Sequence, residues 1–167
     1  MTNIFQYEIK KYTKNKTDIN KINLDIIPNT NGIYMVGLSE TAEPIEFLEN
    51  TSAKIKSSYT VADLIDKYKT GNKEILYIGK AETLKSKNRG LKKRLKELLQ
   101  FANGECENHS GGKDLWRIKN WQKELVIYWC EVNNARMVEK HLLELHAKNF
   151  PSEKGKKFSY PFANWQS

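Results

Sequence analysis

Three short segments rich in β-branched and aromatic residues constrain this chain most, because helical patterns separate them. The segments are 33–38, 75–79 and 125–130, and residues such as Val, Ile, Tyr and Trp favour strands. Apolar positions with a helical period follow at 91–102 and 135–148, and a shorter helical pattern follows Thr60. Strands separated by helices predict an α+β domain with a small sheet.

Length and composition exclude several classes of protein. The chain has 167 residues, enough for one domain with its own core, and its 39% of apolar residues argues against disorder. No apolar run approaches the roughly 18 residues that span a bilayer, and the first residues lack a secretory leader. We therefore expect a cytoplasmic protein without a membrane partner, in which Cys106 and Cys130 are free thiols.

The chain is expected to fold as a single domain, residues 1–167. Residues 1–30 form an irregular lead-in that packs on the core, and residues 152–167 form a basic and then aromatic tail. The polar stretch 39–72 carries a short helix, because Thr60 followed three residues later by Asp63 is an approximate capping box. The net charge of +8 favours an anionic partner, nucleic acid above all.

Two polar residues fall on or beside the apolar faces of the predicted helices. Arg94 lies at the margin of the leucine face of helix 91–102, where it either binds an anion or covers the edge of the core. Glu139 projects into the middle of the apolar stripe of helix 135–148. A buried carboxylate needs a partner, and a cation, a basic side chain or a proton would serve.

The histidines do not predict a zinc site. His146 shares the face of Glu139 and is expected to be a core residue whose hydrogen bonds are satisfied. A set made of Cys106, His109, His141 and His146 fails on spacing, because the last two residues are five apart and point to different sides of one helix.

Five short motifs occur in a fixed order along the chain. They are Gly32-Ile33-Tyr34, Tyr77-Ile78-Gly79 with Lys80, Leu91-Lys92-Lys93-Arg94-Leu95, Glu139 in the last helix, and Pro161-Phe162-Ala163-Asn164. Because all five motifs occur together and in this order, the chain resembles the GIY-YIG nuclease superfamily over about residues 31–164. Residues 35–76 separate the two tripeptides by far more than is usual in the family, so that 39–72 is an insertion. A smaller insertion, 84–90, leaves Arg89 as the alternative to Arg94.

The resemblance implies a three-stranded, mainly antiparallel sheet flanked by helices, and a metal-dependent endonuclease acting on nucleic acid, with DNA as the first expectation. Glu139 would bind the single Mg²⁺ or Mn²⁺, a hard ion that suits one carboxylate plus water and phosphate oxygens. Arg94 would grip the scissile phosphate. Tyr34 would activate water with help from Tyr77, Lys80 or metal-bound water, Lys80 being alternatively a phosphate contact. Asn164 would orient the site, and Gly32 and Gly79 would meet backbone requirements.

Other lysines are expected to follow a nucleic-acid backbone. They are Lys92, Lys93 and Lys96 of the arginine-bearing helix, together with Lys113. No small-molecule cofactor is expected, and a homodimer is one option for cutting two strands. The alternative function is a catalytically inactive nucleic-acid-binding module on the same scaffold, and a third reading is an interaction protein that has lost the chemistry.

Overall fold

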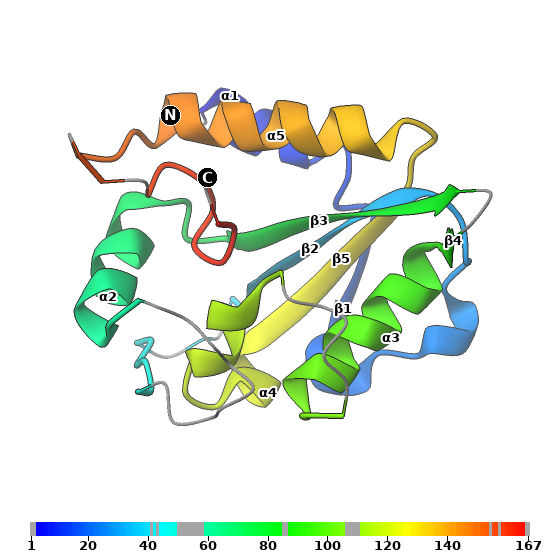
Figure 1. Cartoon of the computed structure of the whole chain (residues 1–167), viewed down its shortest axis with the longest axis horizontal. Coiled ribbons are helices and arrows are strands. Elements are labelled where there is room, and N and C mark those ends of the chain that lie inside the picture. The colour runs from blue at the N-terminus through cyan, green and yellow to red at the C-terminus, as the bar shows by residue number, and fades with distance from the viewer. Residues whose placement is uncertain are drawn as a thin grey trace.

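The fold is an antiparallel sheet with helices on both faces (Figure 1). The computed structural model describes residues 3–40, 42, 44–49, 59–84, 87–105, 111–153, 155–156 and 158–165. Its strands are β1 (Asn15–Asp18), β2 (Gly32–Leu38), β3 (Ile75–Leu84), β4 (Lys87–Arg89) and β5 (Leu125–Glu131). They pair in the order β1-β5-β2-β3-β4, and all the pairings are antiparallel.

Helices and short 3₁₀ turns complete these described parts of the chain. The helices are α1 (Ile4–Ile9), α2 (Val61–Thr70), α3 (Leu91–Ala102), α4 (Trp121–Glu124) and α5 (Ala135–Asn149). The 3₁₀ turns are η1 (Ile19–Lys21), η2 (Leu24–Ile26) and η3 (Lys113–Arg117). The α+β class and the antiparallel sheet are thus confirmed, whereas the predicted number of three strands is too low.

The three predicted strands are the centre of the sheet and are buried on both faces. Ile33 and Met35 of β2 face a core that includes Phe5 and Leu142 and lies under α1 and α5. Tyr34 and Val36 face the opposite core, under α3. Figure 1 shows α5 and α1 on one side of the sheet and α3 on the other. Side chains that are buried on both faces explain why these segments read as almost continuous apolar runs.

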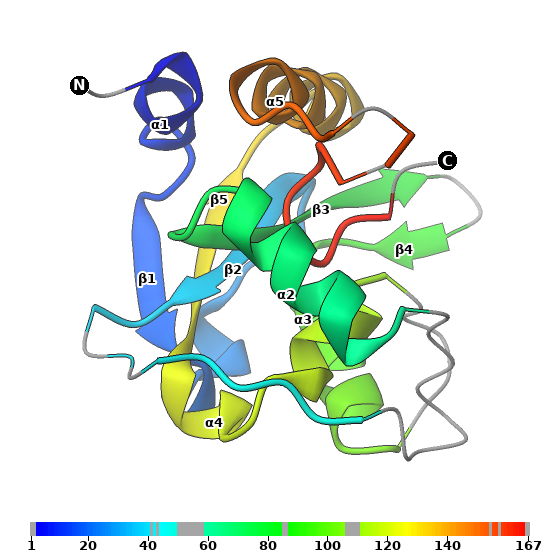
Figure 2. The same ribbon diagram turned by 90° about the vertical axis from the view of Figure 1, so that its left-hand side faces the viewer.

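The two missed strands lie at the edges of the sheet, where the sequence carries little signal. Strand β1 has the sequence Asn-Lys-Thr-Asp and is ordered by pairing with β5. Strand β4 pairs with the C-terminal end of β3 and belongs to the predicted insertion 84–90. Figure 2 shows β1 and β4 at opposite edges. Polar edge strands lack the alternation that identifies half-buried strands, so their pairing depends on the neighbouring strand.

The lead-in over residues 1–30 packs on the core as expected, but its described part is not irregular. This segment contains helix α1, strand β1 and the turns η1 and η2. Phe5 and Ile9 of α1 are buried against the core beneath α5. A helix of six residues is too short to be stable alone. Its order comes from this packing, which residue propensities do not report.

The stretch 39–72 contains the predicted helix, α2. Thr60 accepts a hydrogen bond from the Asp63 N–H, and the Asp63 carboxylate accepts one from the Thr60 N–H, which completes the capping box. Residues 41, 43 and 50–58 of this stretch lie outside the described residues, as do Cys106, His109 and parts of the tail 152–167. Cys130 is a free, buried thiol. In the described part of the chain, we find no helix long and apolar enough to cross a membrane.

Helices α3 and α5 end within a residue of their predicted limits, but the face that α5 buries is rotated from the expected one. The buried stripe of α5 is formed by Ala135, Val138, Leu142 and His146. Glu139 lies at the edge of this stripe and not in its middle, and 21% of its side chain is exposed. This rotation turns Glu139 towards β3, whose Lys80 it contacts.

Candidate functional site

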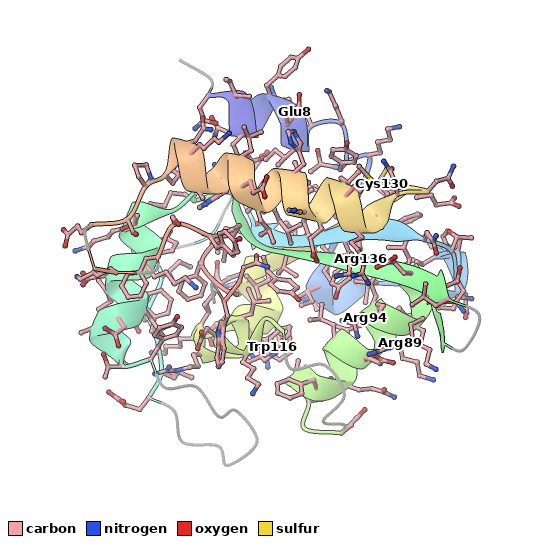
Figure 3. All side chains as sticks on the ribbon, turned by 45° about the horizontal axis from the view of Figure 1, so that its top comes forward. Glu8, Arg89, Arg94, Trp116, Cys130 and Arg136 are labelled. Carbon is pink, nitrogen blue, oxygen red and sulfur yellow. The ribbon has the colours of Figure 1, made fainter. Side chains whose placement is uncertain are left out.

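A cleft lies at the β3–β4 edge of the sheet, where four elements converge. Its lining residues are Tyr77, Lys80, Glu82 and Leu84 of β3, Arg89 of β4, Arg94 of α3 and Glu139 of α5, and its volume is about 210 Å³. Figure 3 shows Arg89 and Arg94 on the side of the molecule between α3 and α5, with Arg136 nearby. The tertiary structure thus brings together four of the predicted site residues, namely Tyr77, Lys80, Arg94 and Glu139.

Glu139 is paired with a basic side chain, which is one of the three partners that the sequence leaves open. The Lys80 ammonium lies 3.4 Å from its carboxylate, and both side chains are partly exposed in the cleft. Burial raises the pKa of Glu139, and the charge of Lys80 only partly opposes this effect. Charge-assisted N–H···O hydrogen bonds measure about 2.7–2.9 Å. The Lys80–Glu139 pair is therefore loose, and its two members remain open to the cleft.

Arg89 and Arg94 converge on one carboxylate, that of Glu97. The nearest guanidinium nitrogens of Arg94 and Arg89 lie 3.0 and 2.5 Å from the Glu97 Oε2 atom. Burial alone would raise the pKa of Glu97, but the two guanidinium groups outweigh it and hold that pKa below its ordinary value. Both arginines line the cleft. Both candidates for the motif arginine, Arg94 and Arg89, thus reach the cleft.

Sequence reasoning missed Glu97. The available signal was its spacing, because Glu97 follows Arg94 by three residues and therefore lies beside it on the helix surface. Arg89, eight residues before Glu97, carries no such local signal. It reaches Glu97 only because the β3–β4 hairpin folds back beside α3.

The two tyrosines of the motifs lie against each other, with ring centroids 6.1 Å apart. Tyr77 lines the cleft, whereas Tyr34 is fully buried behind it and does not. The Arg94 guanidinium donates to the Tyr34 hydroxyl over 3.5 Å. Burial raises the pKa of Tyr34, although the charge of Arg94 and hydrogen bonds from Tyr77 and Arg94 oppose that rise. Burial likewise raises the pKa of Tyr77 well above its ordinary value.

Glycines leave room for both rings. Gly79 is the register partner of Tyr34, and a Cβ atom there would lie 2.3 Å from the Tyr34 Cζ atom. A Cβ atom at Gly111 would lie 2.4 Å from the Tyr77 hydroxyl. At Gly32 a Cβ atom would lie 2.5 Å from the Cys130 carbonyl oxygen and from the Leu91 side chain. Gly32 and Gly79 are expected to meet a backbone requirement, and that requirement is the close approach of neighbouring atoms, for which any side chain would leave no room.

Asn164 does not line the cleft. Its side chain accepts a hydrogen bond from the Ile78 N–H and donates one to the Ile78 carbonyl, both over 2.9 Å. Its own carbonyl accepts a hydrogen bond from the buried Lys67 ammonium over 2.6 Å. Ile78 stands between Tyr77 and Gly79, so these bonds attach the chain's last described segment to the strand that carries the cleft residues. Asn164 is a positioning residue.

The lysines expected to bind nucleic acid lie outside the cleft. Lys93 and Lys96 are exposed on α3, and Lys92 is half-buried. Lys113 is also half-buried, and its ammonium lies 5.5 Å from the centre of the Trp165 ring.

The histidine expected in the core lies there. His146 is completely buried, its Nδ1 atom is 2.6 Å from the Ser159 carbonyl oxygen, and its Nε2 atom accepts from the Asn72 N–H over 3.1 Å. This pattern requires a neutral ring protonated at Nδ1. Among the residues that the structure describes, no group of three or more His, Cys, Asp or Glu side chains could hold a metal ion.

Comparison of the chain with protein-family models, with curated proteins and with solved structures finds no match.

Proposed function

We propose that this protein is a metal-dependent endonuclease similar to the GIY-YIG nucleases, and that the cleft at the β3–β4 edge is its active site. The observation that carries the proposal is the convergence in that cleft of Tyr77, Lys80, Arg94 and Glu139, which come from distant parts of the chain. Phosphodiester cleavage depends on positioning and on neutralising an anionic transition state. A cleft that combines three cations with carboxylates and a phenol supplies both requirements.

The donor set of the cleft fits a hard divalent cation. Glu139 and Glu82 both line it, and the carboxylate of Glu139 remains partly exposed. Mg²⁺ is typically bound by one or two carboxylates, with water and phosphate oxygens completing its coordination. When bound, such an ion would polarise the phosphate and stabilise the leaving oxygen.

The basic residues of the cleft divide the work of binding the substrate. Arg94 and Arg89, aligned by their common partner Glu97, hold the scissile phosphate with planar groups suited to two oxygens. Lys80 exchanges Glu139 for a phosphate oxygen, which leaves that carboxylate free to act as a ligand. The loose geometry of the Lys80–Glu139 pair supports this exchange.

The two phenols orient the attacking water by hydrogen bonding. Tyr77 meets the water at the wall of the cleft, and its hydroxyl is hydrogen-bonded to Tyr34. The positive charge of Arg94 favours a phenolate at Tyr34, while burial disfavours it. Tyr34 is therefore a neutral phenol that holds Tyr77 in place, and the proton of the attacking water passes to solvent in the cleft.

The second candidate function is a nucleic-acid-binding module that does not cleave. Two observations favour it: Glu139 already has a partner in Lys80, and the Tyr34 hydroxyl has no access to solvent. On this reading the cleft binds a phosphate with Arg89 and Arg94 and releases it unchanged.

A cleavage assay separates the two functions. Supercoiled plasmid, single-stranded DNA and RNA are incubated with the protein in Mg²⁺ or Mn²⁺, and the variants Glu139→Gln and Arg94→Ala are compared with the wild type. Matched controls are Glu144→Gln and Lys140→Ala, which change exposed residues of α5 outside the cleft. We expect cleavage by the wild type and both controls and at least a hundredfold loss in the two cleft variants, as for removal of a transition-state contact. Equal rates in all five proteins would exclude the cleft as the active site.

A further inference from the structure

A second hollow lies beside β1, the strand at the edge of the sheet opposite β4 (Figure 2). Its volume is about 280 Å³, and its walls come from β1, from the segment through η1 and η2, and from β5. Three lysines line it, namely Lys14, Lys16 and Lys21, and none of its described lining residues is acidic. We call this hollow the β1 groove.

The lining of the groove also contains apolar side chains and an indole. Trp129 is partly buried, and strand pairing places it directly across from Asn15 of β1, whose side-chain amide donates to the Trp129 carbonyl over 3.1 Å. Ile26 also lines the groove and is 69% exposed, so its side chain is accessible to a ligand.

Two of the three lysines are available to an anionic ligand. Lys14 is exposed and forms no ion pair with any residue in the described ranges. Lys21 contacts Asp18 over 3.5 Å, but the side chains are 75% and 50% exposed, so the pair is weak and a phosphate can replace it. Lys16 points to the other face of the sheet, where its ammonium lies 5.8 Å from the centre of the Tyr128 ring.

We propose that the β1 groove binds single-stranded nucleic acid. Phosphates contact Lys14 and Lys21, and an unpaired base packs against Trp129 and Ile26. Cationic rims combined with an aromatic surface are typical of proteins that bind single strands. A duplex keeps its base faces stacked and would offer only phosphates to these apolar side chains.

The groove and the cleft lie at opposite edges of the sheet. Neighbouring strands in a sheet are about 4.8 Å apart, so the four spacings from β1 to β4 amount to ~19 Å. The start of α3 is joined to the segment after η2, because the Leu91 and Lys92 N–H groups donate to the Thr30 and Pro28 carbonyls over 2.9 and 3.2 Å. Binding in the groove does not depend on cleavage in the cleft.

The test measures binding of fluorescein-labelled (dT)₁₂ and of a 12-base-pair duplex by fluorescence anisotropy, in EDTA so that no cleavage occurs. The variant Lys14→Ala with Lys21→Ala is compared with the wild type and with a matched control. The control, Lys10→Ala with Lys148→Ala, removes two exposed lysines on the α1 and α5 side of the sheet. For two lost contacts to a single strand we expect the salt slope of log K to fall by about 1.4, and the affinity at 0.1 M salt to fall about 25-fold.

The role of Trp129 has its own readout. The chain has four tryptophans, and (dT)₁₂ should quench the intrinsic fluorescence of the wild type and of Trp121→Phe but quench Trp129→Phe much less. An unchanged salt slope in the double lysine variant, or equal wild-type affinity for the duplex, would overturn the proposal. If the groove variants lose binding while the wild type cuts no substrate, the nuclease proposal fails and the groove stands. If the wild type cleaves a substrate while the groove variants bind (dT)₁₂ as tightly as the wild type, the groove proposal fails and the nuclease proposal stands.

Discussion

The placement of the two phenols can be tested through the glycines beneath them. In the structure a Cβ atom at Gly79 would meet Tyr34 at three ring or hydroxyl atoms, Cζ at 2.3 Å, the hydroxyl oxygen at 2.5 Å and Cε2 at 2.6 Å. A Cβ atom at Gly111 would meet Tyr77 closely at one atom only, the hydroxyl oxygen at 2.4 Å, because Cζ is 3.4 Å away. The substitution Tyr77→Phe should therefore restore the stability lost in Gly111→Ala. The substitution Tyr34→Phe should not restore the stability lost in Gly79→Ala.

The expected change in the free energy of unfolding is the sum of two opposing effects. Neither glycine is among those with positive φ, so alanine adds no backbone strain and should gain about 0.4–1 kcal/mol by restricting the unfolded chain. Overpacking against a buried ring costs about 1–3 kcal/mol. Gly79→Ala should therefore cost a net ~1–2 kcal/mol, and at 2–4 °C per kcal/mol for a chain of this size the Tm should fall by ~2–8 °C.

Thermal and urea unfolding of two double-mutant cycles provide the assay. In the Tyr34→Phe background, Gly79→Ala should remain destabilising, because the clashes with Cζ and Cε2 persist. In the Tyr77→Phe background, Gly111→Ala should become neutral or stabilising by about 0.4–1 kcal/mol, because the nearest remaining atom is at ordinary contact distance. The placement of the Tyr34 ring would be refuted if Tyr34→Phe restored the stability lost in Gly79→Ala. The comparison is with Tyr77→Phe, which should fully restore the stability lost in Gly111→Ala.

Two further predictions concern residues that hold the fold around the cleft. Burial lowers the pKa of His146 to about 4 from an ordinary value of about 6.5, so the neutral ring contributes stability above pH 6.5 that is lost as the pH falls towards 4. From this source alone, urea unfolding should give a free energy of unfolding ~3 kcal/mol lower at pH 4 than at pH 7. In His146→Gln, the free energy of unfolding should depend less on pH. Asn164→Ala removes two buried hydrogen bonds to Ile78, and at about 1 kcal/mol each the loss of ~2 kcal/mol should lower the Tm by ~4–8 °C. An unchanged Tm in differential scanning fluorimetry would mean that the Asn164 side chain does not pair with β3.

The site could be predicted from the sequence only where motifs mark it. Tyr77, Lys80, Arg94 and Glu139 all belong to the motifs, and the structure brings them into one cleft. Their predicted chemistry remains a proposal. Glu97, which joins Arg94 to Arg89, carries no motif and was found only from the contacts of its carboxylate.

Glu139 illustrates the limit of reading a helix from its sequence. A helical wheel gives angles around an axis but does not say which angle faces the sheet, so it placed Glu139 in the centre of the buried stripe. Packing against β3 and α1 sets that rotation and places His146 in the stripe, with Glu139 at its edge. The same rotation gives Glu139 its partner, Lys80.

The amino-acid sequence by itself determined the elements whose stability is largely local or whose pattern is strong. These are the three central strands, with side chains buried on both faces, the helices α3 and α5, and the start of α2 at its capping box. Tertiary structure alone decided the edges, because β1, β4 and α1 are short and take their order from neighbours distant in the chain. It also decided which charges meet in the cleft and in the β1 groove, since a contact between distant residues is set by packing, to which local residue preferences are blind.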